Sequence, residues 1–166
     1  MNASGINIVD LSNRRGAIIR LRTQIYELLK ETLGGPYTSF PNYVTWNQQF
    51  SKELVDARRK WLFALDETAR FVYGLMFYRL AEDGALYLNH MAIRQGAGDF
   101  IKKFEQDDSA KTATKIFFSR HIKKITSEEI LEGKGMSNDS VYNSDGYQLI
   151  GDITEAVKEL QKRYVL

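Results

Sequence analysis

The sequence predicts one α/β (α+β) domain, in which helices cover both faces of a mixed, mostly antiparallel central sheet. Three strand-like segments in the middle of the chain are joined by short turns, which is typical of antiparallel strands. The later strand-like segments are separated by helical patterns, which favours crossover connections. Hydrophobic residues make up 43% of the chain, enough for a continuous core, so we expect residues 1–166 to form a single domain.

The first part of the chain predicts one strand and two helices. Residues 5–11 are a short β-favouring run, and Ser12 or Asn13 can cap the helix that follows. Apolar residues recur at helical spacing up to the glycine and proline stop at residues 34–36, and again over residues 44–60. The two apolar stripes consist of Ile18, Leu21, Ile25, Leu28 and Leu29, and of Trp46, Phe50, Leu54 and Ala57. Each helix should therefore pack one face against the sheet.

The middle of the chain predicts three consecutive strands. Residues 61–65 and 71–80 are apolar runs separated by a turn-like segment, and residues 85–93 form a third run. The Asp83-Gly84 pair between the last two favours a tight hairpin turn, because such turns need positive φ values. The three strands should lie side by side.

The last part of the chain predicts alternating helices and strands. Gly96 and Gly98 interrupt the chain before a helical pattern at residues 99–113. We then expect a strand at residues 115–122, a short helix that starts at residues 126–129, one or two strands at residues 141–150, and an amphipathic helix at residues 153–166.

Composition excludes several classes of protein. The 23 basic and 21 acidic residues are interspersed, so we expect no nucleic-acid partner. There is no cysteine and there are only two histidines, so we expect no metal site. No run approaches the length needed to span a bilayer, and the first ten residues do not have the pattern of a secretion signal. We therefore expect a cytoplasmic protein with no membrane partner.

The element order, together with a strand that ends in Met91, Ala92 and Ile93 and runs into a glycine-containing turn and a helix, resembles the GNAT acetyltransferases over nearly the whole chain. In that family this turn has the pattern Q/R-x-x-G-x-G/A and binds the pyrophosphate of acetyl-CoA, because exposed amides at a helix start attract anions. The resemblance implies that acetyl-CoA separates two central strands and lies along the backbone of Met91, Ala92 and Ile93. Its pyrophosphate would bind at Gln95, Gly96, Ala97 and Gly98.

The turn departs from the family pattern in three ways. Only Arg94 separates the strand from Gln95, where the family usually has several residues. Phe100 stands where the family has glycine or alanine, and Asp99 brings a carboxylate that would repel a phosphate. The alternative interpretation is a glycine-rich turn with no ligand.

The proton donor for the departing thiolate also differs from the family. Residues 130–136 resemble the family's short helix with a catalytic tyrosine, but Leu131 stands at the tyrosine position and cannot donate a proton. Tyr142 and Tyr147 are candidate catalytic substitutes if the fold brings one of them close. The alternative is that both are aromatic strand residues that pack on the sheet.

His90 is the candidate general base, because its ordinary pKa lies near neutrality. Strand alternation predicts that its side chain and that of Asn89 point to opposite faces of the sheet. The alternative is a hydrogen-bonded histidine with a structural role.

Three hypotheses about function remain open at this stage. The first is an acetyl-CoA-dependent N-acetyltransferase that transfers the acetyl group directly to a primary amine of a small molecule or peptide, with the aromatic segment at residues 36–46 lining the acceptor site. The second is a non-catalytic GNAT-like module that binds a protein or another ligand. The third is an unrelated α+β fold without separated central strands. The apolar end at residues 164–166 can dock on its own sheet or on a second copy, which makes a homodimer possible.

Overall fold

The computed structural model describes residues 6–31, 41–119, 122 and 146–164 of the chain. Its centre is a mixed sheet with the strand order β1-β2-β3-β4-β5-β6, in which only β4 and β5 are parallel neighbours. The strands are β1 (Asn7–Asp10), β2 (Arg59–Leu65), β3 (Val72–Leu80), β4 (Ala85–Ile93), β5 (Lys115–Ser119) and β6 (Tyr147–Gly151). The helices are α1 (Arg15–Arg20), α2 (Arg22–Leu29), α3 (Tyr43–Leu54), α4 (Ala97–Gln106), α5 (Asp108–Thr112) and α7 (Ile153–Arg163).

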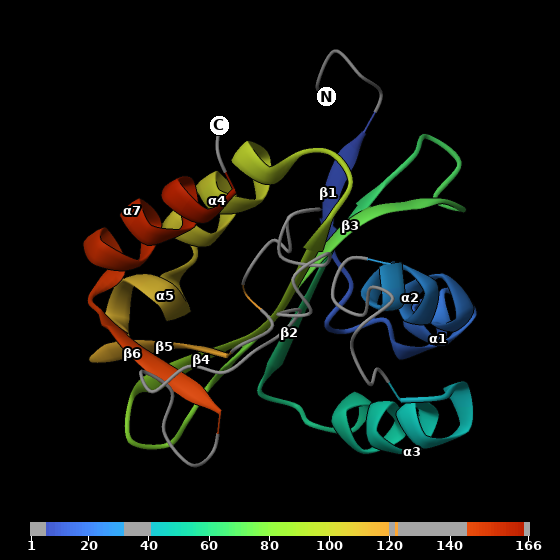
Figure 1. Cartoon of the computed structure of the whole chain (residues 1–166), viewed down its shortest axis with the longest axis horizontal. Coiled ribbons are helices and arrows are strands. Elements are labelled where there is room, and N and C mark those ends of the chain that lie inside the picture. The colour runs from blue at the N-terminus through green and yellow to red at the C-terminus, as the bar shows by residue number, and fades with distance from the viewer. Residues whose placement is uncertain (1–5, 32–40, 120–121, 123–145, 165–166) are drawn as a thin grey trace, which may run out of the picture.

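Helices cover both faces of this sheet, which confirms the predicted fold class. Figure 1 shows α1, α2 and α3 on one side of the strands and α4, α5 and α7 on the other. Each side has its own hydrophobic cluster, because successive side chains of a strand point to opposite faces. On β3, Met76 belongs to the cluster under α4 and α7, whereas Phe77 belongs to the cluster under α1 to α3.

Aromatic rings fill the cluster on the α1–α3 face. Trp46 and Phe50 of α3 stack at 4.8 Å, and the Phe50 ring lies edge-on to Trp61 of β2 at 5.7 Å. Tyr26 of α2 contacts both Tyr43 and Trp46. The described end of the segment that the sequence assigns to an acceptor site, residues 41–46, therefore contributes its large rings to the core. Residues 36–40 lie outside the described residues.

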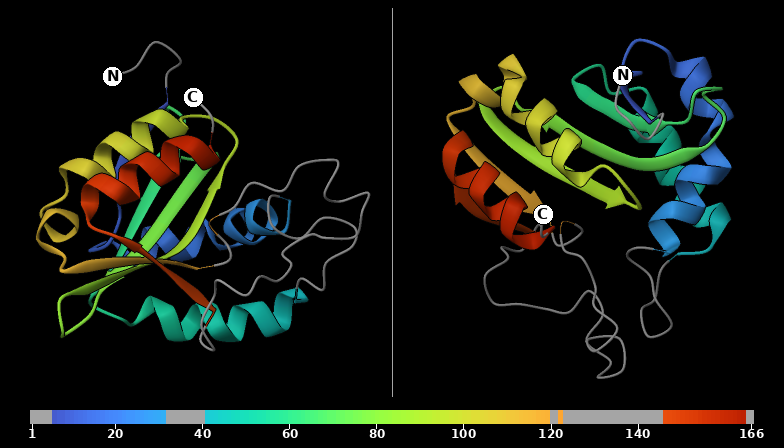
Figure 2. Two further views of the ribbon diagram at one scale, coloured as in Figure 1. Left: turned by 60° about the vertical axis from the view of Figure 1, so that its left-hand side comes forward. Right: turned by 90° about the horizontal axis from the view of Figure 1, so that it is seen from above.

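On the opposite face, α4 and α7 lie side by side (Figure 2). Phe100, Ile101 and Phe104 of α4 are buried against the sheet, as their spacing predicts. The start of α7 is fixed by a capping box, in which Asp152 accepts from the Glu155 amide and Glu155 accepts from the Asp152 amide. Both helices are thus anchored at the point where they leave the sheet.

Three predicted helix boundaries are wrong. The helix expected at residues 44–60 ends at Leu54, because Asp56 accepts from the Arg58 amide and from Arg79 of β3, so that β2 already begins at Arg59. The helix expected at residues 99–113 is interrupted at Asp107, which is extended, caps the Ser109 amide and accepts from the hydroxyl of Tyr78. The first expected helix is divided at Leu21 into α1 and α2.

Some expected elements lie outside the described residues, namely the helix start at residues 126–129, with Leu131, and the first part of the strand at residues 141–150, with Tyr142. In the ranges that the structure describes, none of the helices combines the length and the apolar character needed to cross a bilayer.

Candidate functional site

Strands β4 and β5 are paired over only part of their length. The parallel pairing runs from Ala85 with Lys115 to Leu88 with Phe118, while β4 continues to Ile93. The stretch Asn89 to Ile93 of β4 therefore has no strand partner on its β5 side among the described residues. We call this stretch the β4–β5 opening. The resemblance to GNAT acetyltransferases predicts such a separation, and the hypothesis of an unrelated fold does not.

A β-bulge begins the opening. In the pairing of β3 with β4, Phe77 lies opposite His90 and Tyr78 lies opposite Leu88, so that Asn89 is an extra residue in β4. The Asn89 amide contacts Arg59, whose guanidinium lies over Phe77, and the His90 ring also packs edge-on to Phe77 at 6.0 Å. The prediction that Asn89 and His90 point to opposite faces is therefore wrong, because the bulge turns both towards the α1–α3 face.

Four polar side chains meet at this bulge, and we call Glu53, Arg59, Asn89 and Tyr147 the bulge cluster. Arg59 Nη2 lies 3.4 Å from Glu53 Oε1, and Arg59 Nη1 donates to Asn89 Oδ1 at 3.4 Å. Asn89 Nδ2 donates to the Tyr147 hydroxyl oxygen at 2.6 Å. The cluster links α3, β2, β4 and β6, so the structure brings predicted catalytic residue Tyr147 next to the bulge. His90 is the neighbour of Asn89 in sequence.

Arg59 is the buried member of the bulge cluster, and its surroundings are aromatic. The Arg59 guanidinium is buried, and it lies 5.1 Å from the Trp61 ring centroid and 5.7 Å from that of Phe77. Burial lowers the pKa of Arg59 from its ordinary value, which the negative charge of Glu53 opposes. Burial raises the pKa of the Tyr147 phenol, while the Asn89 hydrogen bond and the Arg59 charge act in the opposite direction. Tyr147 is thus protonated at neutral pH and can donate a proton.

Two side-chain hydroxyl groups donate hydrogen bonds to backbone carbonyls of the opening. Ser119, at the end of β5, donates to the Asn89 carbonyl at 2.6 Å. Tyr164, directly after α7, donates to the Met91 carbonyl at 3.0 Å. The neighbouring Arg163 donates to the Ile122 carbonyl at 2.9 Å and to Gln148 on β6 at 3.0 Å. The end of α7 therefore joins β4 to the β5–β6 side of the opening, and Tyr164 docks on its own sheet.

The predicted binding residues Met91, Ala92 and Ile93 do not all face the opening. Neighbouring residues in a strand direct their backbone groups to opposite sides, and the Met91 carbonyl points to the β5 side, where Tyr164 binds it. The backbone groups of Ile93 share that direction, whereas those of Ala92 point towards Leu75, its partner on β3. Of these three residues, only Met91 and Ile93 therefore present N–H and C=O groups to a molecule in the opening.

The opening leads directly to the start of α4. The amides of Arg94 and Gln95 both donate to the Tyr73 carbonyl, and Gly96 then takes a φ of +92°, which favours glycine. A methyl group on Gly96 would have no heavy atom within 4 Å, so the turn has space beside it. The first amides of a helix have no partner within the helix, and Gly96 has no side chain to cap those of Ala97, Gly98 and Asp99. The turn can therefore approach an anion.

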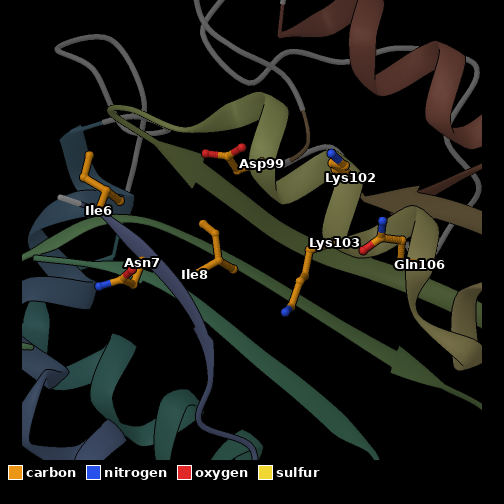
Figure 3. A pocket seen from close by; sticks show the side chains of 7 residues that line it. All are labelled: Ile6, Asn7, Ile8, Asp99, Lys102, Lys103 and Gln106. Carbon is orange, nitrogen blue, oxygen red and sulfur yellow. The ribbon is translucent and has the colours of Figure 1, made fainter. Parts of the chain in front are cut away.

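Neither of the two residues that depart from the family pattern fills this turn. Phe100 is fully buried and packs against Gly74 of β3. Asp99 lies in a groove between α4 and β1, which Figure 3 shows on the side of the helix towards Ile6. The groove is lined by Ile6, Asn7, Ile8, Asp99, Lys102, Lys103 and Gln106. The Asp99 carboxylate thus points to the edge strand, with two lysines one turn further along the helix.

Sequence reasoning missed five residues of this site: Glu53, Arg59, Asn89, Ser119 and Tyr164. Arg59 falls within the helix expected at residues 44–60, and Asn89 is expected only on the face opposite His90, whereas Glu53, Ser119 and Tyr164 carry no motif. A signal was present only for Asn89, as a polar side chain in an otherwise apolar strand next to His90. Tyr142, the other predicted proton donor, lies outside the described residues.

The fold is similar to that of solved GNAT acetyltransferases. An acetyltransferase of the GNAT family from Staphylococcus aureus Mu50 matches with a TM-score of 0.53 and 11% identity, over 87% of this chain and 95% of that chain. An aminoglycoside acetyltransferase from an uncultured soil metagenomic sample, in complex with trehalose, matches with a TM-score of 0.49 and 18% identity, over 85% and 95% of the two chains. A mutant of the spermidine N-acetyltransferase of Vibrio cholerae matches with a TM-score of 0.46 and 15% identity, over 69% of each chain.

No model of a protein family and no curated protein sequence matches this chain. The likeness to the Staphylococcus aureus structure, at 11% identity, concerns the fold. It confirms the resemblance inferred from the element order: the chain has the GNAT fold.

Proposed function

We propose that the chain is an acetyl-CoA-dependent N-acetyltransferase that transfers the acetyl group directly to a primary amine. The observation that supports this proposal most is the β4–β5 opening, which continues into a helix that starts at a glycine with positive φ. An unpaired strand edge can bind an extended, amide-containing chain, and a helix start can bind phosphates. Acetyl-CoA has both features: beyond the acetyl thioester comes an extended arm with amide groups, and after the arm comes a pyrophosphate.

In this proposal the backbone of Met91 and Ile93 binds the pantetheine arm, and the turn of Gln95, Gly96, Ala97 and Gly98 binds the pyrophosphate. Acetyl-CoA supplies the acetyl thioester. The amine nitrogen forms the new C–N bond as the C–S bond breaks, His90 accepts the proton that the amine loses, and Tyr147 donates a proton to the thiolate. The phenol of Tyr147 suits this role because its burial keeps it protonated at neutral pH.

The acceptor and the surroundings belong to the proposal as well. The α1–α3 face carries the bulge cluster, so we place the acceptor, a small-molecule or peptide amine, on that face of β4. We expect the protein to act in the cytoplasm, without a nucleic-acid, membrane or metal partner. A homodimer would fit the edge of β1, which has no neighbouring strand on one side among the described residues, because an unpaired strand edge can add a second strand.

The second candidate function is a non-catalytic GNAT-like module that binds a protein or another ligand. One observation favours it: the carbonyls of Asn89 and Met91, which face the opening, already accept hydrogen bonds from Ser119 and Tyr164 of the chain itself. A pantetheine arm would have to replace the Tyr164 hydroxyl. The two functions therefore differ in whether acetyl-CoA binds at all.

Calorimetric titration with acetyl-CoA tests the proposal. We expect the unmodified chain to bind acetyl-CoA, and Gly98→Glu to weaken this binding at least tenfold, because the new carboxylate would lie beside the phosphates. A glutamate in the first turn is compatible with the helix dipole, so α4 should remain folded. Thr154→Glu, which adds the same charge in the exposed first turn of α7, is the matched control.

Acetylation of a panel of primary amines, followed by mass spectrometry, then tests the activity. Binding of acetyl-CoA without transfer to any amine would favour the non-catalytic module. If no heat is detected at millimolar acetyl-CoA, or if Gly98→Glu binds as well as the Thr154→Glu control, the proposed cofactor site is wrong.

A further inference from the structure

We infer that Asn89 and Arg59 are positioning residues that orient the proton of Tyr147 for transfer to the departing thiolate. This inference rests on the proposed function and goes beyond it, because it names two residues that neither the sequence pattern nor the fold assigns. Both lie in the bulge cluster, on the face of the sheet where we place the acceptor.

The inference depends on which atom donates in the hydrogen bond between Asn89 and Tyr147. Asn89 Nδ2 lies 2.6 Å from the Tyr147 hydroxyl oxygen, and an amide nitrogen can only donate. The Tyr147 oxygen is therefore the acceptor in this pair, and its own O–H donates in another direction. If the amide were turned around, its oxygen would accept the phenol proton and divert it from the thiolate.

Arg59 fixes which way the Asn89 amide is turned. Arg59 Nη1 lies 3.4 Å from Asn89 Oδ1, and a guanidinium has donors only, so the amide oxygen must face Arg59 and the amide nitrogen must face Tyr147. Arg59 is itself held by Glu53 on one side and by the faces of Trp61 and Phe77 on the other. A buried guanidinium next to two aromatic rings has little freedom to move, which favours this orientation of the amide.

The β-bulge places Asn89 and His90 side by side on one face of the sheet. Leu88 and Met91 both belong to the cluster under α4 and α7, so alternation from Leu88 directs Asn89 to the α1–α3 face, and the extra residue brings His90 to the same face. On that face Asn89 reaches Arg59 on β2 and Tyr147 on β6, two strands that are not neighbours in the sheet. The bulge that begins the β4–β5 opening therefore brings the proposed base next to the residue that positions the proton donor.

The Asn89 hydrogen bond and the Arg59 charge act on the pKa of Tyr147 in the direction that the inference requires, whereas Glu53 and Tyr87 act against it. The groups that affect it are Arg59 of β2, Glu53 of α3 and Tyr87 of β4, in addition to Asn89. Burial raises the pKa of Tyr147, and the Asn89 hydrogen bond and the Arg59 charge both lower it. A phenol whose pKa is held down against burial is a better donor to a thiolate than a buried phenol alone.

The test compares Asn89→Asp with Tyr147→Phe in steady-state kinetics. Aspartate has nearly the shape of asparagine, but its carboxylate only accepts, so it would take the phenol proton. We expect each variant to lower kcat about 100-fold with little change in KM, the range of general acid catalysis. The double variant should fall no further, because both changes remove the same step. Tyr26→Phe, which removes a hydroxyl that donates to the Pro41 carbonyl and not to the bulge cluster, is the control.

A second readout does not depend on activity. The pKa of Tyr147 is measured by carbon-13 NMR of labelled tyrosine, with assignment from the Tyr147→Phe spectrum. We expect this pKa to rise in Asn89→Asp, and to rise in Arg59→Met if that variant folds. Arg59→Lys keeps a positive charge, so the pKa of Tyr147 in this variant should lie between its values in the unmodified chain and in Arg59→Met.

The outcomes separate this inference from the proposed function. Multiplicative losses in the double variant, or an unchanged kcat in Asn89→Asp despite a raised Tyr147 pKa, would overturn the positioning role while acetyl transfer stands. A Tyr147 pKa that does not move would also overturn it. If the unmodified chain transfers no acetyl group, the proposed function falls first, and a shifted Tyr147 pKa then describes a structural hydrogen bond only.

Discussion

The Phe100 ring is buried against Gly74 of β3 and does not fill the start of α4. A methyl group on Gly74 would lie 2.9 Å from Cε2 of Phe100, closer than two carbon atoms tolerate. Glycine on β3 thus provides the space into which the ring turns, away from the amides of Ala97 and Gly98. The departure from the family pattern at position 100 is therefore compensated on a neighbouring strand.

Gly74→Ala should destabilise the protein by about 1–3 kcal/mol, because the ring is fully buried and cannot rotate away without strain. The free energy of unfolding is measured by urea denaturation. Gly16→Ala is the control: a methyl group there meets nothing within 4 Å, and alanine in a helix should stabilise by up to about 1 kcal/mol. Equal effects at the two positions would show that Phe100 does not depend on Gly74.

At the scale of single residues, the sequence predicted which side chains lie near the bulge better than it predicted the faces of the sheet to which they point. His90 and Tyr147 were found as chemically capable side chains, and both lie at the bulge. That His90 shares the face of Asn89 was not predictable, because a bulge is a mismatch between two strands and leaves no mark in the sequence of one. Arg59 was misassigned for a related reason: its strand begins where Asp56 binds Arg79, which is 23 residues away in sequence.

Helix α7 has a role that its own sequence does not reveal. Its amphipathic pattern predicted the helix, and its capping box agrees with that prediction. The contact of Tyr164 with the Met91 carbonyl spans 73 residues of sequence, so no local pattern could indicate it. Element types followed from local periodicity, whereas helix ends and the closure of the opening depend on contacts between distant segments.

Tyr164→Phe should strengthen acetyl-CoA binding if the pantetheine arm uses the Met91 carbonyl. The unmodified chain must break the Tyr164 hydrogen bond before that carbonyl is available, which costs about 1 kcal/mol, or roughly a fivefold change in Kd. Calorimetry measures the Kd. The same variant should lower the free energy of unfolding by about 1 kcal/mol, since it loses that bond in the unliganded state.

Tyr26→Phe is the matched control for this experiment. Its hydroxyl donates to the Pro41 carbonyl at 2.9 Å, on the other face of the sheet, so its loss should destabilise the protein without changing the Kd. An unchanged Kd in Tyr164→Phe would mean that the ligand does not compete for the Met91 carbonyl.

At the scale of the whole molecule, the predicted architecture is confirmed because it depended on redundant signals. Three consecutive apolar runs with an Asp-Gly turn predict an antiparallel sheet. The helical patterns before and after these runs predict helices that cover both faces of that sheet. Strands β1, β2, β3 and β4 contribute side chains to both hydrophobic clusters, whereas β5 and β6 contribute to the cluster under α4 and α7. The clusters share one backbone layer, so neither can lose its packing without disturbing the strands on which the other depends.

The two faces should therefore unfold together. Both tryptophans, Trp46 and Trp61, belong to the cluster on the α1–α3 face, so tryptophan fluorescence reports that face, whereas far-UV circular dichroism reports the whole chain. Ile116→Val removes one buried methyl group from the opposite cluster and should cost about 0.5–1.5 kcal/mol. In urea denaturation we expect it to shift the fluorescence and dichroism midpoints equally, as should Ile25→Val on the tryptophan side. If Ile116→Val moves the dichroism curve and leaves the fluorescence curve in place, the sheet does not couple its two faces.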